Sequence, residues 1–479
     1  MKFDPHTRRD FLKESAATLA MMALPLSSPA QTSYKVRMEW TDFMRSGHYS
    51  ALLDALKVMQ ANRNSSDKNS WQYWVNVHIN NCPHGIPYFL AWHRGYIYYF
   101  ERQLQLISND PGLTLPYWDY YANPQIPSDF TNSASGNPLY TQRTNTNVHQ
   151  ALTLAPFTSS IGFQRNTNAS FEASLEGAPH NPVHDLIGGY MADMSSPMDP
   201  IFYLHHANID RLWYAWALSH PKAIPASTNR YWSGSFSYAS GLSINRNKTI
   251  DPHILGYEYA SNSMPAKLPP QAHEGRIIRV QAQAEPIRNR PPAKRLDPTP
   301  PTDIARGRHS FGGVKNLDAD ENSVSVQITV PPANASAVAN IVTQWSAAAE
   351  VAAQTASTPE VTVVNVVMDK LTITGQGKKG GFLYNVYLNL PTSDVSNEDL
   401  PNYFIGTIGA FEISGASHHG AATLTFAATD VLARTGTAGS NQMTVSLIRV
   451  SGATHAKGKV IGIGEIRLES QDPTTIQAQ

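Results

Sequence analysis

The chain has 479 residues, a formal net charge of zero and 15% charged residues. This length is sufficient for two or three domains with a sizeable core. The balanced charge gives no indication of nucleic-acid binding or of attraction to an anionic membrane surface. A single cysteine, Cys82, excludes an intramolecular disulfide.

The first 30 residues have the pattern of an export signal. An Arg8-Arg9 pair precedes an apolar stretch over residues 16–26, and small residues at 28–30 offer a cleavage site. The apolar stretch is too short to span a bilayer. The alternative is a cytoplasmic N-terminal helix with two chance arginines. We expect residues 1–30 to be a twin-arginine signal peptide, and the mature chain to be periplasmic or secreted without a membrane anchor.

Residues 31–260 are predicted to be mainly helical and to form the catalytic domain. Apolar residues recur at helical spacing over 40–59, 87–107 and 201–218. Residues 115–170 are rich in Asn, Ser, Thr and Pro, which favours long loops. Aromatic residues are concentrated in this part of the chain, and they suit either a pocket lining or a large core.

The rest of the chain divides into a Pro- and Arg-rich stretch and a β region. Residues 261–312 are predicted to be an exposed linker that is open to proteolysis. Over residues 313–479, short β-branched runs separated by Gly, Asn and Ser predict a β-sandwich. An Ala-rich segment at 337–353 is either a helical or a flexible insertion. The strand candidates are 324–330, 361–367, 383–390 and 443–450. The predicted fold class is therefore α+β and multidomain.

Histidines are grouped in a way that is typical of a metal site. His180 and His184 are one helical turn apart, so both imidazoles can face one metal ion. Two trios stand out: His78, His84 and His93, and His180, His184 and His206. Three neutral imidazoles suit zinc, copper, iron or nickel. Copper fits best because carboxylate and thiolate ligands are missing from the pattern, although spacing alone does not exclude zinc.

The residues around both trios resemble the tyrosinase and polyphenol oxidase family of type-3 copper proteins. The segment from His78 through Cys82-Pro83-His84 to Trp92-His93-Arg94 is similar to the copper A motif of that family. The segment from His180-Asn181 through Asp199-Pro200 to His205-His206-Ala207-Asn208 and Trp213 is similar to its copper B motif. The C-terminal region resembles that of plant polyphenol oxidases more weakly.

The resemblance implies a four-helix bundle that holds two copper ions, each by three histidines. His206, the later histidine of the adjacent pair, carries over as a ligand, and His205 becomes a near neighbour that tunes substrate choice. Dioxygen is the implied co-substrate, and small phenols are the implied partners. The Tyr-x-Tyr motif at 257–259 resembles the end of the family's catalytic domain, with Arg37 expected to stack on it. A homo-oligomer is compatible with the sequence.

Four further residues receive roles from the resemblance. Glu176 and Asn181 correspond to a pair that holds a water near copper B and deprotonates monophenols. The alternative is that Asn181 orients a ring or caps a helix, and that Glu176 is a loop charge. Cys82 and His84 are expected to be joined by a thioether, with a plain buried thiol as the alternative. Asp185 either favours amine-bearing phenols at the pocket mouth or contacts a helix neighbour.

The predicted function is copper-dependent oxidation of monophenols and o-diphenols to o-quinones. The β region is expected to keep the enzyme latent until it is displaced or cleaved. A catechol oxidase or an o-aminophenol oxidase without monophenolase activity is the first alternative. An oxygen carrier of the haemocyanin kind is an alternative from another class.

Overall fold

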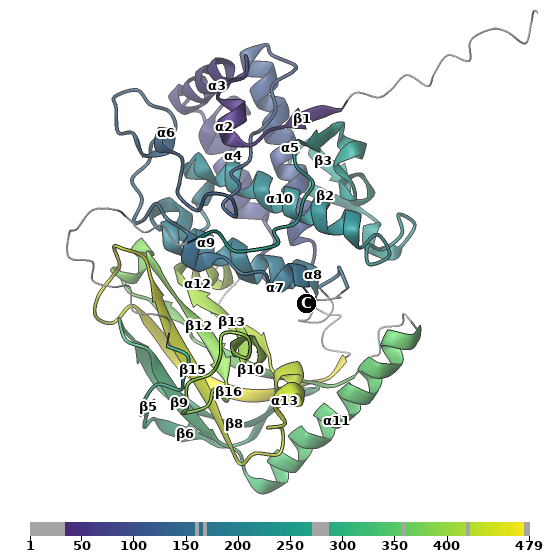
Figure 1. Ribbon diagram of the computed structural model, residues 1–479, viewed down its shortest axis with the longest axis vertical. Helices are drawn as coiled ribbons and strands as arrows, with labels where there is room; N and C mark the ends of the chain where they lie inside the picture. The colour runs from purple at the N-terminus through teal and green to yellow at the C-terminus, as the bar shows by residue number, and fades with distance from the viewer. Residues whose placement is uncertain are drawn as a thin grey trace, which may run out of the picture. The chain divides into compact units, whose positions relative to one another are not determined.

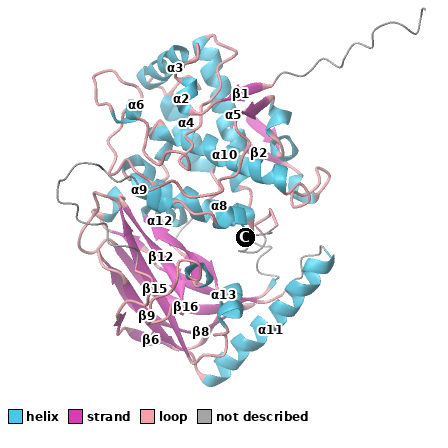
Figure 2. Cartoon of the chain, in the orientation of Figure 1, coloured by secondary structure: helices cyan, strands magenta, loops and turns pink. Residues whose placement is uncertain are grey.

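The computed structural model describes residues 34–158, 162–165, 170–270, 287–355, 361–417 and 422–473. The predicted signal peptide lies outside these residues. Apart from the first 35 residues, the chain forms one unit, Val36–Gln479. Helices dominate through Leu255 and strands dominate from Ala293 onward (Figure 2). The expected α+β class is therefore confirmed, while the four-helix bundle remains a prediction. Within the described residues, no helix has both the length and the apolar character needed to cross a membrane.

Five helices make up most of the helical region. They are α3 (Tyr49–Ala61), α4 (Trp71–Asn81), α5 (Phe89–Ser108), α9 (Asn181–Ile187) and α10 (Ile201–Ser219). The helix predicted over 40–59 is divided into α2 (Trp40–Phe43) and α3, because a turn that contains Gly47 separates them. A glycine in this position weakens helix continuation.

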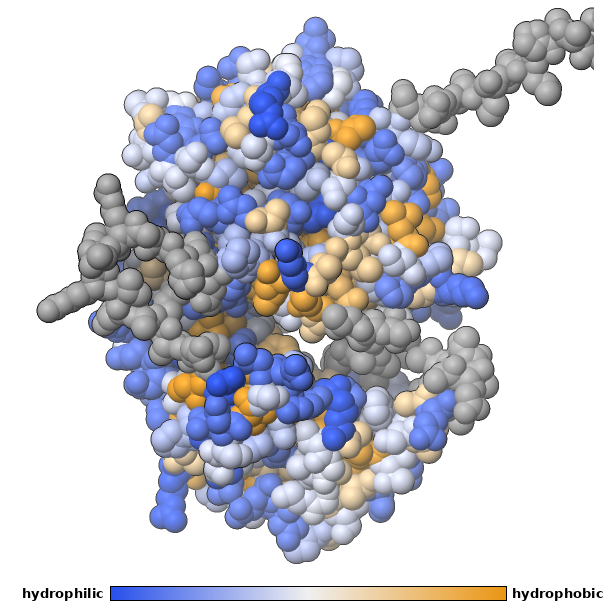
Figure 3. Space-filling view, viewed as in Figure 1, coloured by the Kyte–Doolittle hydropathy of each residue, from blue (hydrophilic) through white to orange (hydrophobic). Residues whose placement is uncertain are grey.

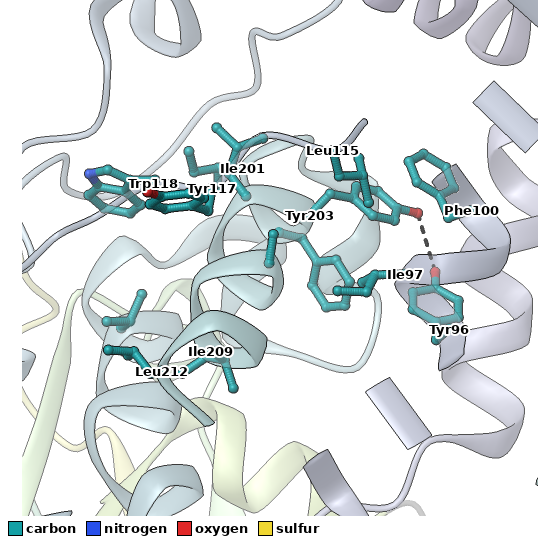
Figure 4. Close-up of a cluster of buried hydrophobic side chains, with 14 of the residues drawn as sticks. Tyr96, Ile97, Phe100, Leu115, Tyr117, Trp118, Ile201, Tyr203, Ile209 and Leu212 are labelled. Atoms are coloured by element: carbon teal, nitrogen blue, oxygen red, sulfur yellow. Dashed lines mark hydrogen bonds between the residues drawn. The ribbon is translucent and has the colours of Figure 1, made fainter. Parts of the chain in front are cut away.

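Helices α5 and α10 pack against each other through aromatic side chains. The rings of Phe100 and Tyr203 stack with centroids 3.7 Å apart. The hydroxyl groups of Tyr96 and Tyr203 lie 3.2 Å apart and form the hydrogen bond drawn in Figure 4. These contacts fix the two longest helices of the region relative to each other.

Helix α10 is buried around its whole circumference from Ile201 to Trp216. A helix that is buried on every side normally carries apolar residues throughout. Here it also carries the buried polar residues His205, His206, Asn208, Asp210 and Arg211. Because buried polar groups are destabilising without partners, this helix needs polar neighbours inside the protein.

Short elements and loops connect these helices, as the composition of residues 115–170 predicts. The elements between α5 and α10 are α6 (Ser128–Thr131), η1 (His149–Ala151), α7 (Ala155–Thr158), α8 (Phe171–Leu175), η2 (Glu176–His180), η3 (Gly189–Ala192) and η4 (Ser196–Met198). After α10 come η5 (Arg230–Trp232), β2 (Ser235–Ala239), β3 (Leu242–Asn245), η6 (Arg246–Thr249), η7 (Pro252–Leu255) and β4 (Tyr257–Tyr259), and β4 pairs with β1 (Lys35–Arg37).

Two sheets form the β region (Figure 1). The seven-stranded sheet has the order β14-β10-β16-β8-β6, with β11 on β16 and β7 on β8. Its strands are β6 (Asp297–Thr299), β7 (Thr302–Ala305), β8 (Arg308–Ala319), β10 (Val363–Asp369), β11 (Thr372–Ile373), β14 (Leu424–Ala427) and β16 (Ile461–Gln471). The five-stranded sheet has the order β13-β12-β15-β9-β5. Its strands are β5 (Ala293–Lys294), β9 (Val324–Thr329), β12 (Phe382–Leu388), β13 (Phe404–Gly409) and β15 (Gln442–Ser451).

Both sheets contribute side chains to a single hydrophobic cluster. Val366 and Ile466 come from the seven-stranded sheet, and Val326 and Val386 come from the five-stranded sheet. The sheet pairings are antiparallel except for β5 with β9. Charged and polar residues cover most of the face seen in Figure 3, with apolar residues scattered among them. The apolar side chains of the strands therefore serve mainly to join the two sheets.

Regular β structure begins earlier than the sequence indicates. Strands β5, β6 and β7 and the start of β8 fall inside 261–312, the range predicted to be a linker. Pro298 lies in β6, at one end of the strand order, and edge strands tolerate proline because its missing N–H faces outward. Proline content alone was therefore a poor guide to the linker boundary.

Three helices accompany the sheets. The Ala-rich segment forms α11 (Pro332–Thr355), which settles the alternative between helix and flexible insertion in favour of a helix. Helix α12 (Ala410–Ser417) directly follows β13, and α13 (Thr429–Thr435) follows β14. Two short 3-10 turns, η8 (Gly377–Lys379) and η9 (Leu400–Asn402), flank β12 in the sequence. Helix α12 matters for the site because it contacts α9.

Candidate metal centre

The first histidine trio is brought together by α4, the segment after α4, and α5. Nδ1 of His78 lies 3.0 Å from the carbonyl oxygen of Met194, and Nδ1 of His93 lies 2.8 Å from that of Phe89. A ring nitrogen that donates to a carbonyl leaves Nε2 with its lone pair. The two Nε2 atoms are 3.5 Å apart. The ring of His84 lies 5.5 Å from that of His78 and 5.1 Å from that of His93, between centroids.

The second trio comes from η2, α9 and α10. Nδ1 of His184 lies 2.8 Å from the carbonyl oxygen of Met191, which leaves its buried Nε2 without a hydrogen-bond partner. Nε2 of His180 lies 3.3 Å from Nε2 of His206. Nδ1 of His180 contacts Oδ1 of Asn181 at 2.7 Å. The free ring nitrogens of this trio thus face one another.

The two trios are immediate neighbours. The rings of His93 and His206 stack with centroids 4.5 Å apart and an interplanar angle of 17°. The rings of His84 and His180 lie 5.7 Å apart at 25°. Two histidines of each trio therefore lie against two of the other, an arrangement that suits a two-metal centre.

Burial favours the neutral imidazole form for five histidines of the two trios. Desolvation is the main cause that lowers the pKa of five histidines, and neighbouring histidines lower it further: His84, His93, His180, His184 and His206. Neutral imidazole is the form that binds metal ions. Both ring nitrogens of His84 are buried and lack hydrogen-bond partners. Buried, unpartnered and neutral nitrogen donors fit a metal such as copper or zinc.

His205 lies beside the second trio. The ligand atoms of His180, His184, His205 and His206 lie within 4.8 Å of one another. The ring of His205 stacks on that of His180 with centroids 5.1 Å apart, and both of its nitrogens are buried without a partner. His205 is thus a fourth nitrogen donor in reach of the same site.

Cys82 is buried next to the first trio. Its sulfur and the ligand atoms of His78 and His84 lie within 4.8 Å of one another. Burial raises the pKa of the Cys82 thiol well above its ordinary value. The fold thus brings the predicted thioether partners, Cys82 and His84, together.

Glu176 and Asn181 are also brought to the centre, and both are engaged by other protein groups. Oε1 of Glu176 accepts a hydrogen bond of 2.7 Å from the backbone N–H of Gly85, and its other oxygen pairs with Arg165. Burial raises the pKa of Glu176, whereas the charge of Arg165 opposes this rise. Sequence reasoning missed Arg165 because the surrounding loop carries no periodic signal.

Asp185 contacts α12 rather than open solvent. Its Oδ1 accepts a hydrogen bond of 2.8 Å from the backbone N–H of Phe411, which lies 226 residues away. The carboxylate lies so close to Gly409 that a Cβ there would be 1.9 Å from Oδ2. Burial and the neighbouring Glu412 raise the pKa of Asp185. Of the two alternatives for Asp185, the structure favours contact with a helix neighbour.

Phe411 covers the second trio, and sequence reasoning did not find it. Its ring stacks on the ring of His184 with centroids 4.0 Å apart and an interplanar angle of 18°. It also lies 5.2 Å from the ring of His84 and 5.5 Å from that of His180. No sequence signal distinguishes this phenylalanine from others in the β region, because its role depends on a contact between distant segments.

A buried ion network supports α10 behind the metal centre. Asp210 accepts hydrogen bonds from Arg94 Nε at 2.5 Å, Tyr257 Oη at 2.6 Å and Tyr259 Oη at 2.5 Å. The guanidinium carbon of Arg37 lies 3.7 Å from the centroid of the Tyr257 ring, which confirms the predicted stacking. This network supplies the polar neighbours that a fully buried α10 needs.

Comparison with known proteins agrees with this geometry. The family model for the common central domain of tyrosinase matches residues 68–160 and 135–219. Tyrosinase HcTyr1 of Hahella sp. is 32% identical over 237 residues, which cover 39% of this chain and 50% of the relative. The chloroplastic polyphenol oxidase A1 of Vicia faba is 27% identical over 337 residues, which cover 56% of this chain and 54% of the relative.

The structure of latent apple tyrosinase resembles this one over most of its length. The TM-score is 0.53 at 18% sequence identity, with 92% of this chain and 98% of the apple chain covered. This likeness extends through the C-terminal β region. Residues 68–219 therefore carry the central domain of the tyrosinase family, and the C-terminal region has the fold seen in latent apple tyrosinase. The chain matches about half the length of the two curated relatives described above.

Proposed function

We propose that this chain is a dicopper phenol oxidase that converts monophenols and o-diphenols to o-quinones with dioxygen. The observation that carries the proposal is the pair of neighbouring histidine trios. In one trio Nε2 of His93 lies close to Nε2 of His78, in the other Nε2 of His180 lies close to Nε2 of His206, and buried ring nitrogens of His84 and His184 have no hydrogen-bond partner. In the proposal, His78, His84 and His93 hold copper A, and His180, His184 and His206 hold copper B. The two bound copper ions would supply the two-electron chemistry with dioxygen.

In the proposed reaction, Glu176 and Asn181 hold the water that accepts the proton of a monophenol. Each residue lies beside one of the trios: Asn181 contacts His180 of the second trio, and Glu176 accepts a hydrogen bond from the backbone of Gly85, directly after His84 of the first trio. A positioned carboxylate is a suitable general base for this step. A catechol oxidase or an o-aminophenol oxidase without monophenolase activity remains the alternative, because these enzymes do not need that proton transfer.

Latency follows from the position of Phe411 in the proposal. A ring stacked at 4.0 Å on His184 occupies the side of the trio that an incoming phenol needs. Asp185 supports the cover through the backbone of α12, and after displacement of α12 its carboxylate would be available to amine-bearing phenols. The segment 261–312 between β4 and β8 is the proposed place of cleavage, although it already contains the first short strands.

Two further elements of the proposal concern maturation. A thioether between Cys82 and His84 would fix the ring of a copper A ligand, and the proximity of the two side chains supports it. The twin-arginine pair near the N-terminus supports export of the folded chain. Mass spectrometry of the purified, reduced protein tests the thioether, because the bond removes two hydrogens and blocks alkylation of Cys82.

The function is tested with copper-loaded chain before and after limited proteolysis, offered a monophenol and then a catechol. We expect two copper ions per chain and turnover of both substrates after cleavage. Turnover of catechol alone would support the catechol oxidase alternative. Reversible oxygen binding without turnover of either substrate would support the haemocyanin-like alternative and contradict the proposal.

A further inference from the structure

A buried ion cluster beside the metal centre contains Arg165 and Glu172, which have no role in the proposed function. Glu172 on α8 and Glu176 on η2 are one helical turn apart in the sequence, and both are buried. Arg165 precedes α8 and pairs with the carboxylate of Glu176. The positive charge of Arg165 opposes the rise in pKa that burial causes at both Glu172 and Glu176.

The pair of Arg165 and Glu176 is linked to a metal-binding loop. The second oxygen of Glu176 accepts the backbone N–H of Gly85 at 2.7 Å, and Gly85 directly follows His84. Glu176 is therefore held from two sides, by a guanidinium on one and by the copper A loop on the other. This arrangement fixes the direction of the carboxylate more tightly than either contact alone.

The surroundings of Glu176 otherwise disfavour its ionised form. Glu172 on α8 and Glu412 on α12 are carboxylic acids that act on the same site, and the buried Cys82 lies within electrostatic range. A buried carboxylate among other acids takes up a proton unless a cation compensates it. Arg165 is the cation that the structure pairs with Glu176.

We propose that Arg165 is a positioning residue for monophenol oxidation: it keeps Glu176 ionised and correctly oriented as the general base. The inference rests on the proposed function, in which Glu176 receives the phenol proton through a bound water. Oxidation of an o-diphenol makes less demand on this base. Loss of Arg165 should therefore separate the two activities.

The ionisation of Glu176 is tested first in the metal-free, full-length chain by infrared spectroscopy at neutral pH. A Glu172→Gln background removes the signal of Glu172, and the signals of the remaining carboxyl groups, including Glu412, are common to all variants compared. In this background, Arg165→Met should add the carbonyl band of a protonated carboxyl group, and further replacement by Glu176→Gln should remove that band. Absence of the additional band would overturn the inference whether or not the chain is an oxidase.

The reaction is tested in the full-length, copper-loaded chain that carries Phe411→Ala to uncover the site. Arg165→Met should lower monophenol oxidation on the order of 100-fold, the size of a general-base contribution, and change catechol oxidation by only a few-fold. Arg165→Lys keeps the positive charge but lacks the planar guanidinium group, so its rate of monophenol oxidation should lie between those of the parent and of Arg165→Met. Arg45→Met, which removes an exposed arginine paired with Asp42, is the matched control.

An equal fall in both activities would contradict a role specific to the base. If the uncovered parent oxidises neither substrate, the proposed function fails, and the infrared result still decides whether Arg165 controls the ionisation of Glu176. Circular dichroism and copper content establish that each variant is folded and loaded. If Arg165→Met does not fold, Arg165→Gln replaces it in both measurements.

Discussion

The helical region and the β region bury different kinds of side chain. Around α10 the interior contains Arg37, Arg94 and Asp210 in addition to five of the six histidines of the two trios. The cluster between the two sheets is built mainly from Val, Ile, Leu and Phe, and Arg467 with Glu469 forms a buried ion pair of the β region. The helical region therefore depends on individual polar partners, whereas the stability of the β region is distributed over many interchangeable contacts.

The two regions meet where α12 reaches α9. Phe411 brings an apolar ring from the β region onto His184, and Asp185 accepts the backbone N–H of that same residue. Other contacts also join the two regions, among them the hydrogen bond from Thr407 to the backbone of Gly177. The contact at Phe411 is the one where we place the control of activity. The following substitutions test this division, from the largest expected effect to the smallest.

Removal of a ligand should have the largest effect. We expect His184→Ala to reduce the copper content from two ions to one per chain and to lower catechol oxidation by more than about 100-fold, the upper range for residues that only support a ligand. Metal analysis and rate measurement after activation test this. His48→Ala, at a histidine paired with Asp110 outside the trios, serves as the control. Retention of two copper ions by His184→Ala would remove His184 from the ligand set.

Loss of a buried ionic partner should strongly destabilise the helical region. Asp210→Asn leaves the guanidinium groups of Arg37 and Arg94 without their shared anion. We expect the free energy of unfolding to fall by about 3–5 kcal/mol, as for other broken buried pairs. Urea denaturation measures this loss. Asp54→Asn, whose partner Lys57 is exposed, should change stability by less than about 1 kcal/mol, and equal losses would refute the dependence on buried partners.

Removal of the covering ring should activate the uncleaved chain. In protein cores, replacement of a packed phenylalanine by alanine lowers the free energy of unfolding by about 3–5 kcal/mol. Because Phe411 packs on the rings of His184 and His84, we expect Phe411→Ala to uncover them and to raise catechol oxidation on the order of tenfold or more. Phe404→Ala, at a phenylalanine that contacts Tyr387 in the β region, should leave the rate unchanged. A similar rise in both variants would show general loosening instead of uncovering.

Glu172 should give the helical region a pH-dependent stability. Burial raises the pKa of Glu172 to about 7, so the folded chain retains a proton that the unfolded chain releases at lower pH. Stability should therefore decrease as the pH rises from the ordinary pKa of glutamate toward 7. Glu172→Gln should remove this decrease and improve stability at pH 8 relative to pH 5 by about 1–3 kcal/mol. Denaturation curves at both pH values test this, and an unchanged slope would contradict it.

A small change in the β core should have the least effect. Ile328→Val removes one methylene from the cluster between the sheets and should lower the free energy of unfolding by about 0.5–1.5 kcal/mol. Copper content and the monophenol-to-catechol ratio should stay the same. A change in either would mean that the two interiors are coupled beyond the contact at Phe411.

Much of the metal centre was predictable from the sequence, because its ligands lie in short local patterns. His180 and His184 are a helical turn apart, His205 and His206 lie together in the predicted helix 201–218, and Cys82 is two residues from His84. Local spacing sets which side chains share a helix face. The long strands and helices were also predictable from local patterns, because their apolar periodicity reflects one buried face. Edge strands rich in proline carried no such periodicity and were mistaken for a linker.

By itself, the sequence determined the two histidine trios, the helical and β regions, and the likeness of the central domain to tyrosinases. Only the tertiary structure decided that Phe411 stacks on His184, that Asp185 is held by α12, and that Arg165 pairs with Glu176. These three contacts join segments that no local pattern relates. Their side chains acquire a role only when burial removes water and leaves one particular neighbour as the partner.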